Sequence, residues 1–368
     1  MSPTLVVLLA ALTQTDGGPP PAPETDHVAA VSPAPDPYAK LPERLEDAKR
    51  LLAKTAIGTD RLGGREAVLA VWNAAEDKLV TVQVRGGLSR TRGFAVRLVQ
   101  QNGVNTLYEV TEPSGYEVLA IRTNVLAARG ARRRGPRTVP AVYVPYGTVL
   151  HRPHMIAAGR GYLEGLADTA GNRLDELEVR SLADPDRLVT EMIPERVLIT
   201  LMIIEHIDPD DFRAKGARRT MEEVMAMTAA NGRESFAYSF SYAGAGGLAQ
   251  FIRSTYWLTR SRYPTAKLLP DFMDGMRDHT NAIMAQYCLA DWSLAKLPAA
   301  KLKELLATSR EEELGAYLAA AYNGGESRAA DTLLKRPRDW EQPGRGLRPE
   351  TVQYVREFRE IYRLLGEP

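Results

Sequence analysis

The chain has 368 residues, of which 44% are hydrophobic and 25% charged, and its formal net charge is +1. This length is sufficient for two domains with hydrophobic cores. Because the charges nearly cancel, the composition gives no whole-chain argument for nucleic acid or an anionic membrane as a partner. The single cysteine, Cys288, cannot form an intrachain disulfide or complete a thiolate zinc site. We expect it to be a small buried hydrophobic residue.

Residues 1–37 are predicted to be a possible signal segment followed by a linker. Residues 5–12 (LVVLLAAL) form an apolar run that is too short to cross a bilayer. The run is similar to the core of an export signal, although no Lys or Arg precedes it and no clear cleavage site follows. A short buried strand or a disordered end is the alternative. Residues 17–37 are rich in proline, which favours an extended spacer. We therefore expect a periplasmic or secreted protein of the cell envelope, without a transmembrane helix and with this segment either cleaved or retained.

Residues 38–154 are predicted to form a helix followed by a small antiparallel β domain. Apolar residues recur at helical spacing from Tyr38 to Lys54, with charged residues between them. Short segments rich in β-branched and aromatic residues then alternate with turn signals. They are residues 67–72, 78–84, 94–99, 106–110, 116–121 and 141–146. No nucleophile, metal constellation or phosphate loop stands out among them.

Two polar clusters accompany this domain. Arg129, Arg132, Arg133, Arg134 and Arg137 lie in a loop flanked by Gly and Pro, which favours a solvated loop over a site for an acidic polymer. His151 and His154 could suggest a metal pair, but Pro153 disfavours the helix that would place both rings on one face. We therefore predict no metal site.

The remainder of the chain is predicted to be helical: residues 155–189 are a connector interrupted near Gly171, and residues 190–368 are an all-α domain. The fold class is thus α+β. One helix begins at Pro194 and is apolar on nearly every side up to Glu205. A carboxyl group held among such neighbours should have a raised pKa and could act as a general acid. The alternative is a glutamate that reaches solvent at a helix end.

Three further segments follow this helix. Asp208, Asp210 and Asp211 predict a solvated loop, with an ion site or a water-activating base as the alternative. Residues 234–251 place several glycines before Gln250, a combination that suits a neutral polyhydroxyl ligand. Residues 318–329 place Tyr322 and Asn323 at the end of an Ala-rich helix, where a simple helix cap is the alternative.

These segments together resemble the soluble lytic transglycosylase family, whose lysozyme-like domain cleaves the glycan strands of peptidoglycan. SYAGAGGLAQFIRST (241–255) is similar to the family motif S-x-x-G-A-x-G-L-M-Q-x-x-x-x-T, and AYNGG (321–325) is similar to A-Y-N-A-G. LRPETVQYVREFREIY (347–362) resembles the closing segment around T-x-x-Y-V, and PERVLITLMIIEHIDP (194–209) resembles the helix that ends in the catalytic glutamate. The four matches occur in the family order.

The resemblance implies that Glu205 is the single acid/base. It would protonate the oxygen between N-acetylmuramic acid and N-acetylglucosamine and then deprotonate the 6-hydroxyl of the muramic acid, which leaves a 1,6-anhydro end. No second carboxylate, metal or organic cofactor is implied, in contrast to the usual two-carboxylate glycosidase. The partner would be the peptidoglycan glycan strand. The residues expected to bind substrate are Ser241, Gly247, Gln250, Tyr322 and Asn323.

The chain departs from the family pattern near the acid. His206 stands where the family usually has Ser, and Ala249 stands where it has Met. About thirty-five residues separate Glu205 from Ser241, far more than is usual, so we expect an insertion that contains a helix over residues 220–230. In a rival alignment Glu234 with Ser235 provides the Glu-Ser pair, although Glu234 follows a helix end and a turn.

The sequence leaves several hypotheses about function open. Glu234 could be a second carboxylate in the site, which would permit hydrolysis with water, as in a lysozyme. A catalytically silent peptidoglycan-binding or envelope-structural protein could also keep this fold. The β domain could position the enzyme on its polymer or on an envelope partner protein, and both endo and exo cleavage fit the sequence.

Overall fold

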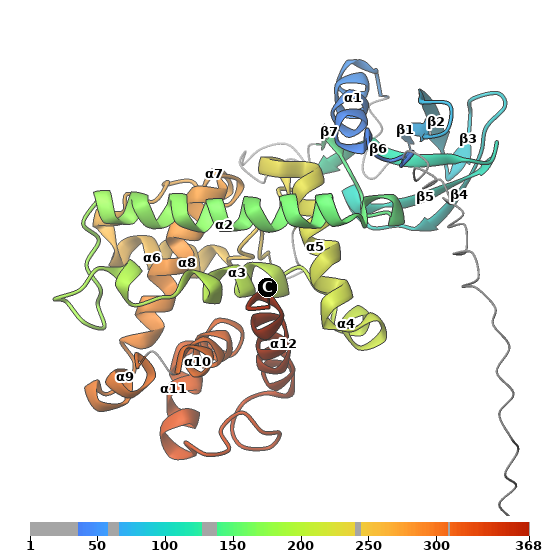
Figure 1. The fold of residues 1–368 in the computed structure, drawn as a ribbon. Coiled ribbons are helices and arrows are strands. Elements are labelled where there is room, and N and C mark those ends of the chain that lie inside the picture. Colours follow the sequence, from blue (N-terminus) through green and yellow to red (C-terminus); the bar gives the residue numbers. More distant parts are fainter. Residues whose placement is uncertain (1–35, 58–65, 127–137, 240–243, 308–309, 368) are drawn as a thin grey trace, which may run out of the picture. The chain divides into compact units, whose positions relative to one another are not determined.

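The computed structural model describes residues 36–57, 66–126, 138–239, 244–307 and 310–367. The chain divides into two units, Met1–Asp36 and Pro37–Pro368. The predicted signal segment, the arginine loop and Ser241 lie outside the described residues. Within the described residues, no helix is both long and apolar enough to span a membrane. Figure 1 shows the elements of the second unit in chain order.

The β domain predicted from the sequence is present, so the α+β fold class is confirmed with helices in the C-terminal part. A five-stranded antiparallel sheet has the order β3-β2-β1-β6-β7, and β4 pairs with β5 in a separate antiparallel hairpin. The strands are β1 (Glu66–Asn73), β2 (Lys78–Arg85), β3 (Leu88–Ser89), β4 (Ala95–Gln100), β5 (Leu107–Glu112), β6 (Tyr116–Leu126) and β7 (Thr138–Tyr143).

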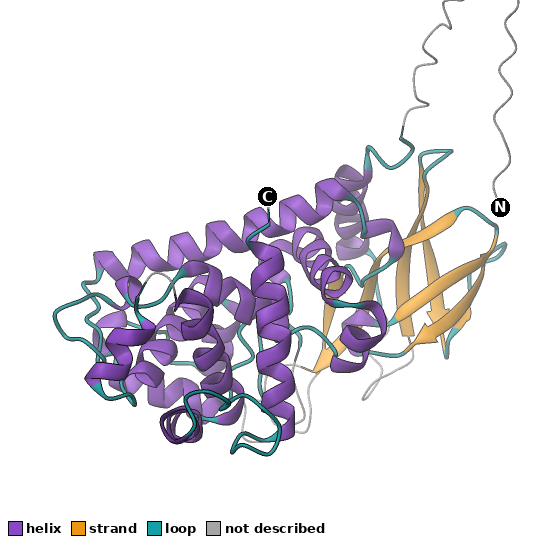
Figure 2. Cartoon of the chain, turned by 60° about the horizontal axis from the view of Figure 1, so that its bottom comes forward, coloured by secondary structure: helices purple, strands orange, loops and turns teal. Residues whose placement is uncertain are grey.

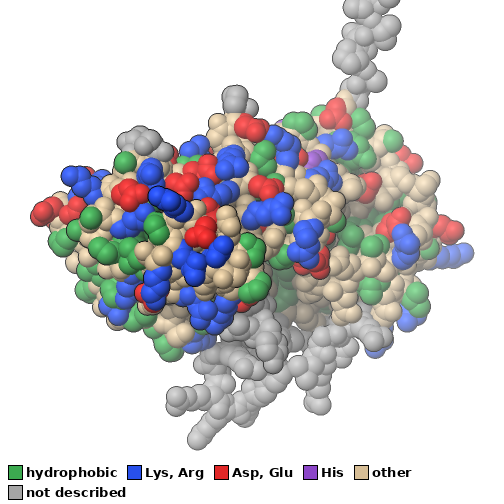
Figure 3. All heavy atoms as spheres, turned by 90° about the horizontal axis from the view of Figure 1, so that it is seen from below, with side chains coloured by type: hydrophobic (Ala, Val, Ile, Leu, Met, Phe, Trp, Pro, Cys, Tyr) green, Lys and Arg blue, Asp and Glu red, His purple; other side chains and the backbone are tan. Residues whose placement is uncertain are grey.

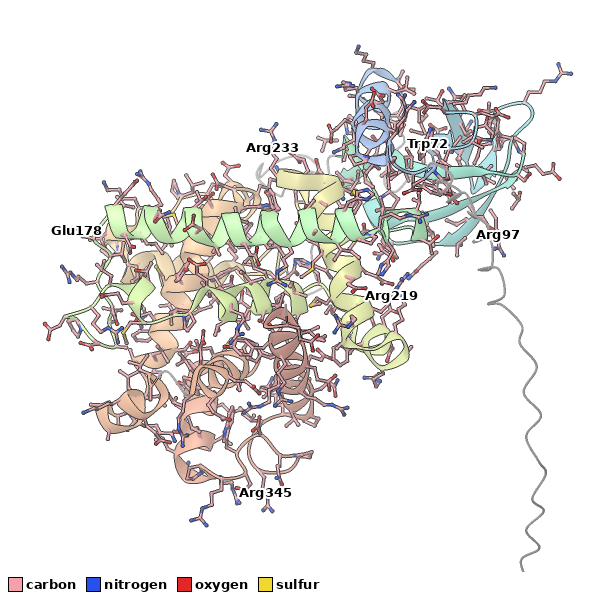
Figure 4. All side chains as sticks on the ribbon, in the orientation of Figure 1. Trp72, Arg97, Glu178, Arg219, Arg233 and Arg345 are labelled. Carbon is pink, nitrogen blue, oxygen red and sulfur yellow. The ribbon has the colours of Figure 1, made fainter. Side chains whose placement is uncertain are left out.

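The central strand β1 is buried on both faces because each face is covered. Successive side chains of a strand point to opposite faces, so Val68, Ala70 and Trp72 pack with helix α1 (Leu41–Lys54), while Leu69 and Val71 pack toward the β4-β5 hairpin. Figure 4 labels Trp72 on the sheet below α1. The burial of both faces explains why β1 reads as an almost continuous apolar run.

The described residues contain twelve α-helices, and one of them differs from the sequence prediction. Helix α2 (Pro153–Glu176) runs without interruption through Gly171, where we expected a break. Gly171 lies near the hydroxyl of Tyr287, but a Cβ there would be 3.4 Å from it, so the position has room for a small side chain. The other helices that follow are α3 (Glu195–Ile204), α4 (Pro209–Lys215), α5 (Ala217–Asn231), α6 (Arg253–Arg262), α7 (Phe272–Arg277), α8 (His279–Leu294), α9 (Ala299–Leu305), α10 (Glu311–Gly324), α11 (Glu326–Lys335) and α12 (Pro349–Leu365).

Short 3₁₀ turns connect several of these elements. They are η1 (Gly103–Asn105), η2 (Thr148–Leu150), η3 (Val189–Glu191), η4 (Gly232–Glu234) and η5 (Pro264–Ala266). Helices α2 to α12 share one large core, in which every residue of α3 from Val197 to Ile204 is buried. Cys288 is also buried there, as expected. Helix α12 packs against both α3 and α10.

Helix α5 is the helix predicted within the insertion, but its packing was not foreseen. Ala226 and Ala230 belong to the core that α1 and the sheet share, whereas Met221, Val224 and Met225 of the same helix belong to the core of the helical domain. At its end, Asn231 exchanges hydrogen bonds with the backbone of Val144 at 2.9 and 3.0 Å. A Cβ at Gly159 of α2 would lie 1.8 Å from the Met225 carbonyl oxygen, so only glycine permits the close contact of α2 with α5. In Figure 2, α2 and α5 adjoin the sheet.

The surface carries both signs of charge. On the face seen from below, which includes α9, α11 and α12, Lys and Arg side chains are interspersed with Asp and Glu (Figure 3). Many of them pair, such as Arg359 with Glu312 at 2.8 Å and with Glu341 at 2.8 Å. The described side chains on this face therefore carry both signs of charge and do not form a field of a single sign.

Candidate active site

Glu205 lies at the carboxyl end of the buried helix α3, where its side chain is only partly exposed. The hydroxyl of Tyr354, from α12, donates a hydrogen bond to Glu205 Oε1 at 2.5 Å. Burial penalises the charged carboxylate and raises the pKa of Glu205 to about 7, although the Tyr354 hydrogen bond acts in the opposite direction. Glu205 is therefore a carboxyl group that can hold or release a proton near neutral pH.

A second tyrosine, Tyr322 at the end of α10, lies within electrostatic range of Glu205. Burial and then the charge of Glu205 raise the pKa of Tyr322 well above its ordinary value, and the same two causes act first on Tyr354. Both phenols therefore remain protonated and can act only as hydrogen-bond donors or neutral acceptors. The Tyr322 hydroxyl donates to the carbonyl oxygen of Ala249.

That carbonyl belongs to the turn over residues 247–250, in which three consecutive carbonyl oxygens each accept from a side chain. Backbone carbonyls in a turn need such partners when water is excluded. The pairs are Gln250 Nε2 to Gly247 (2.7 Å), His206 Nε2 to Leu248 (2.8 Å) and the Tyr322 hydroxyl to Ala249. The turn is therefore tied to the ends of α3 and α10 on either side of the acid.

Gly247 and Gln250 shape this turn through their backbones. Gly247 has φ +73, and a Cβ there would lie 2.4 Å from the Met276 carbonyl oxygen, so the position accepts only glycine. Gln250 also has a positive φ, of +47, and its amide nitrogen is committed to Gly247 and Ser239. The amide nitrogen of Gln250 therefore stabilises the turn over residues 247–250. Substrate binding by Gln250 and by Gly247 stays a prediction.

His206, the departure next to the acid, is a neutral donor. The Leu248 carbonyl can only accept, so the proton must be on Nε2. Burial lowers the pKa of His206 to about 3, which keeps the ring uncharged. The ring stacks on Phe236 with centroids 3.6 Å apart and planes at 10°. A residue with the reach of serine would not span this distance to the turn.

Asn323 joins the segment 321–325 to α12. Its side chain is exposed, and its Oδ1 accepts a hydrogen bond of 2.8 Å from Thr351 Oγ1. Gly324 lies against the same Thr351 side chain. Because Thr351 and Tyr354 are one helical turn apart, α12 contacts both Asn323 and Glu205. The four segments that carry the family resemblance therefore meet around Glu205, apart from Ser241, which is not described.

Glu234 lies elsewhere. It is exposed in η4, its nearest charged partner is Arg233 at 3.8 Å, and Figure 4 shows Arg233 at the outer end of α5. Its charge acts on Tyr238, Tyr162 and His279. Among the described residues, the carboxylate that influences Tyr322 is Glu205 and not Glu234. The structure thus brings Glu205 together with Tyr322 and leaves Glu234 outside this group.

The sequence analysis missed Tyr354 as a site residue, although the T-x-x-Y-V core was visible. The signal that could have found it is the position of Tyr354 one turn after Thr351, on the helix face that is buried.

Asp208 also differs from expectation, because it caps α4 by accepting from the amides of Asp210 and Asp211, where we expected a loop. His151 pairs with Glu222 at 3.0 Å.

The arrangement can perform proton transfer at one carboxyl group. Among the described residues, no cluster of three or more His, Cys, Asp or Glu side chains could hold a metal ion. A carboxyl group with a pKa near 7 can both donate and accept a proton at neutral pH, which is what general acid/base catalysis requires.

No family model, curated protein or solved structure matches the chain.

Proposed function

We propose that the chain is a lytic transglycosylase that cleaves the β-1,4 bond between N-acetylmuramic acid and N-acetylglucosamine in peptidoglycan. Residues 190–368 would then form a lysozyme-like domain with Glu205 as the only catalytic carboxyl group. The observation that carries the proposal is the grouping of Glu205 with Tyr322 and Tyr354. The three residues come from three of the segments that resemble the family.

The proposed reaction uses one carboxyl group twice, first as an acid and then as a base. Protonated Glu205 gives its proton to the glycosidic oxygen as the bond to the anomeric carbon breaks. The resulting carboxylate takes the proton of the 6-hydroxyl, whose oxygen bonds to the anomeric carbon and closes the 1,6-anhydro ring. A pKa near 7 suits both half-reactions at neutral pH. The Tyr354 hydrogen bond stabilises the carboxylate between the two transfers.

The surroundings of Glu205 are consistent with a single-carboxylate scheme. A two-carboxylate glycosidase needs its carboxyl groups about 5 to 9.5 Å apart across the substrate. Within the described residues, two causes shift the pKa of Glu205: burial raises it and the hydrogen bond from Tyr354 lowers it. No carboxylate is among these causes. Glu234 is exposed, so hydrolysis through that residue is the less favoured function.

The proposal extends to the partners and location of the protein. Ser241, Gly247, Gln250, Tyr322 and Asn323 would line the glycan-binding surface, and no organic cofactor or metal would be needed. With this substrate, the protein would act in the periplasm or outside the cell. The β domain would hold the enzyme on its polymer or on an envelope protein.

Digestion of purified sacculi, followed by mass spectrometry of the released muropeptides, tests the proposal. We expect 1,6-anhydro ends from the wild-type protein. Reducing ends in their place would identify a hydrolytic lysozyme. Sedimentation with sacculi without any released product would identify a binding or structural protein. The last two results contradict the proposal.

A further inference from the structure

A residue of the β domain reaches the catalytic half of the molecule. Tyr143, the last residue of β7, is buried, and burial raises the pKa of its hydroxyl to about 12. This hydroxyl accepts a hydrogen bond of 3.3 Å from the backbone N–H of Phe236. The Tyr143 ring also meets Tyr238 edge to face, with centroids 6.4 Å apart. The β domain thus contacts residues 236–238, which follow α5 and the turn η4.

Phe236 has a backbone conformation that bulky side chains rarely adopt. Its φ is +58, in the left-handed region, and its side chain is buried. Such a conformation persists only where the surroundings hold it, and such outliers gather at functional sites. Here the amide is held by Tyr143 on one side, and the ring is held by stacking on His206 on the other.

The segment that contains Phe236 contacts the turn beside Glu205 by two routes. Through its ring, Phe236 supports His206, whose Nε2 donates to the Leu248 carbonyl at 2.8 Å. Through its backbone, the Ser239 carbonyl accepts from the Gly247 amide at 3.2 Å and from Gln250 Nε2 at 3.3 Å. The same turn receives the Tyr322 hydroxyl. A displacement of Phe236 would therefore move one wall of the site.

We propose that Tyr143, Phe236 and His206 are positioning residues for the proposed reaction, and that the β domain serves through them as a part of the active-site support. Tyr143 fixes the amide of Phe236, the Phe236 ring fixes the plane of His206, and His206 fixes the turn that holds Tyr322 next to Glu205. This inference rests on the proposed function of Glu205. It assigns to the β domain a role in catalysis that is separate from any binding of polymer or partner.

The direct experiment compares Tyr143→Phe, which removes only the accepting oxygen, with Tyr108→Phe in the same hydrophobic cluster. The Tyr108 hydroxyl forms no hydrogen bond with the described residues, so its loss is a matched control. For Tyr143→Phe we expect kcat on a defined glycan strand to fall about tenfold, with KM changed by less than about twofold, because misplaced groups slow the chemical step. Tyr108→Phe should retain the wild-type kcat.

A second readout does not depend on activity. Carbon-13 NMR titration of the Glu205 carboxyl group should show a lower pKa in Tyr143→Phe than in the wild type, by roughly half a unit, because a loosened turn admits water. Circular dichroism and the melting temperature of each variant establish that it is folded. Wild-type kcat together with a wild-type Glu205 pKa in Tyr143→Phe would overturn the proposal.

Variants of His206 test the hydrogen bond from His206 to the Leu248 carbonyl. Glutamine can still donate to the Leu248 carbonyl, whereas leucine cannot. We expect His206→Gln to keep more of the wild-type kcat than His206→Leu, and to keep a higher Glu205 pKa. Equal values in the two variants would contradict a positioning role for the His206 hydrogen bond.

The two proposals fail in different ways. If wild-type protein releases no anhydro product from sacculi, the proposed function fails, while the NMR titrations still report whether Tyr143 and His206 affect Glu205. If the wild type is active and Tyr143→Phe matches it in both readouts, the positioning role fails and the proposed function stands.

Discussion

Glu205 and Glu234 both follow a helix, yet the structure gives them opposite surroundings. Glu205 ends α3, whose last eight residues are all buried, and it accepts a hydrogen bond from Tyr354. Glu234 follows α5 in an exposed 3₁₀ turn with Arg233 as its nearest charged partner. Burial and a hydrogen-bond donor from a distant element therefore distinguish the proposed general acid from Glu234, more than the residue that follows each glutamate in sequence.

The residue after Glu234 illustrates the same point. Ser235 completes the Glu-Ser pair that the family resemblance favours, but it is fully buried and its hydroxyl donates to the carbonyls of Gly232 at 2.6 Å and Thr228 at 3.1 Å. It therefore closes the end of α5 and is engaged with the backbone. A dipeptide match alone cannot distinguish a helix-closing serine from one that serves a catalytic acid.

The largest expected effect comes from removing each carboxyl group in turn. Glu205→Gln should reduce product formation from sacculi by at least about a hundredfold, as for the loss of a general acid. Glu234→Gln should stay within about twofold of the wild type, because the residue is exposed. Initial rates of muropeptide release measure both variants. A hundredfold loss in Glu234→Gln, with an active Glu205→Gln, would reverse the assignment.

A smaller effect is expected from the tyrosine beside each glutamate. The Tyr354 hydrogen bond stabilises the charged form of Glu205 and so lowers its pKa, which means that Tyr354→Phe should raise it. The reaction needs protonated Glu205, so the fall in kcat/KM at high pH should move upward by roughly half to one unit, with a loss of a few-fold in rate. Tyr238→Phe, beside Glu234, is the control and should leave the pH profile unchanged. A downward shift in Tyr354→Phe would contradict this role.

The smallest effect concerns stability. The pKa of Glu205 is about 7 in the folded chain against an ordinary value of 4.5, so the folded state retains a proton that the unfolded state releases between these values. Stability should therefore fall as the pH rises from about 4.5 to above 7, and the cost is at most about 3 kcal/mol.

Glutamine at position 205 cannot ionise, so it avoids this cost. Glu205→Gln should melt a few degrees above the wild type at pH 8 and at nearly the same temperature at pH 4. Differential scanning calorimetry at the two pH values measures the difference. Glu234→Gln should show no such dependence on pH, and an equal gain there would remove the contrast between the two glutamates.

Local patterns predicted most of the secondary structure. Five of the six predicted strand segments match observed strands closely, and the sixth, 141–146, overlaps β7 only over residues 141–143. The apolar run before Glu205 is the buried helix α3. The break expected at Gly171 was wrong, because a glycine can lie within a helix as well as at its end, and α2 continues to Glu176. Short-range periodicity carries no information on which of these two uses applies.

The site was less predictable because its contacts are long-range. The hydrogen bond between Tyr354 and Glu205 joins residues 149 positions apart, and that between Tyr143 and Phe236 joins residues 93 positions apart. No spacing rule covers such pairs. The small residues of α5 were visible, but a row of alanines does not reveal whether it faces a helix or a sheet.

The placement of α5 has a consequence for how the molecule comes apart. This helix lies in sequence between Glu205 and Gly247, yet its alanines complete the core of α1 and the sheet. Removal of residues 38–154 would expose Ala226 and Ala230 of α5 to solvent, because their packing partners lie in α1 and the sheet. We therefore expect the β domain and the helical part to unfold in one cooperative step, and a protein cut between them to lose the packing of α5 along with its β domain.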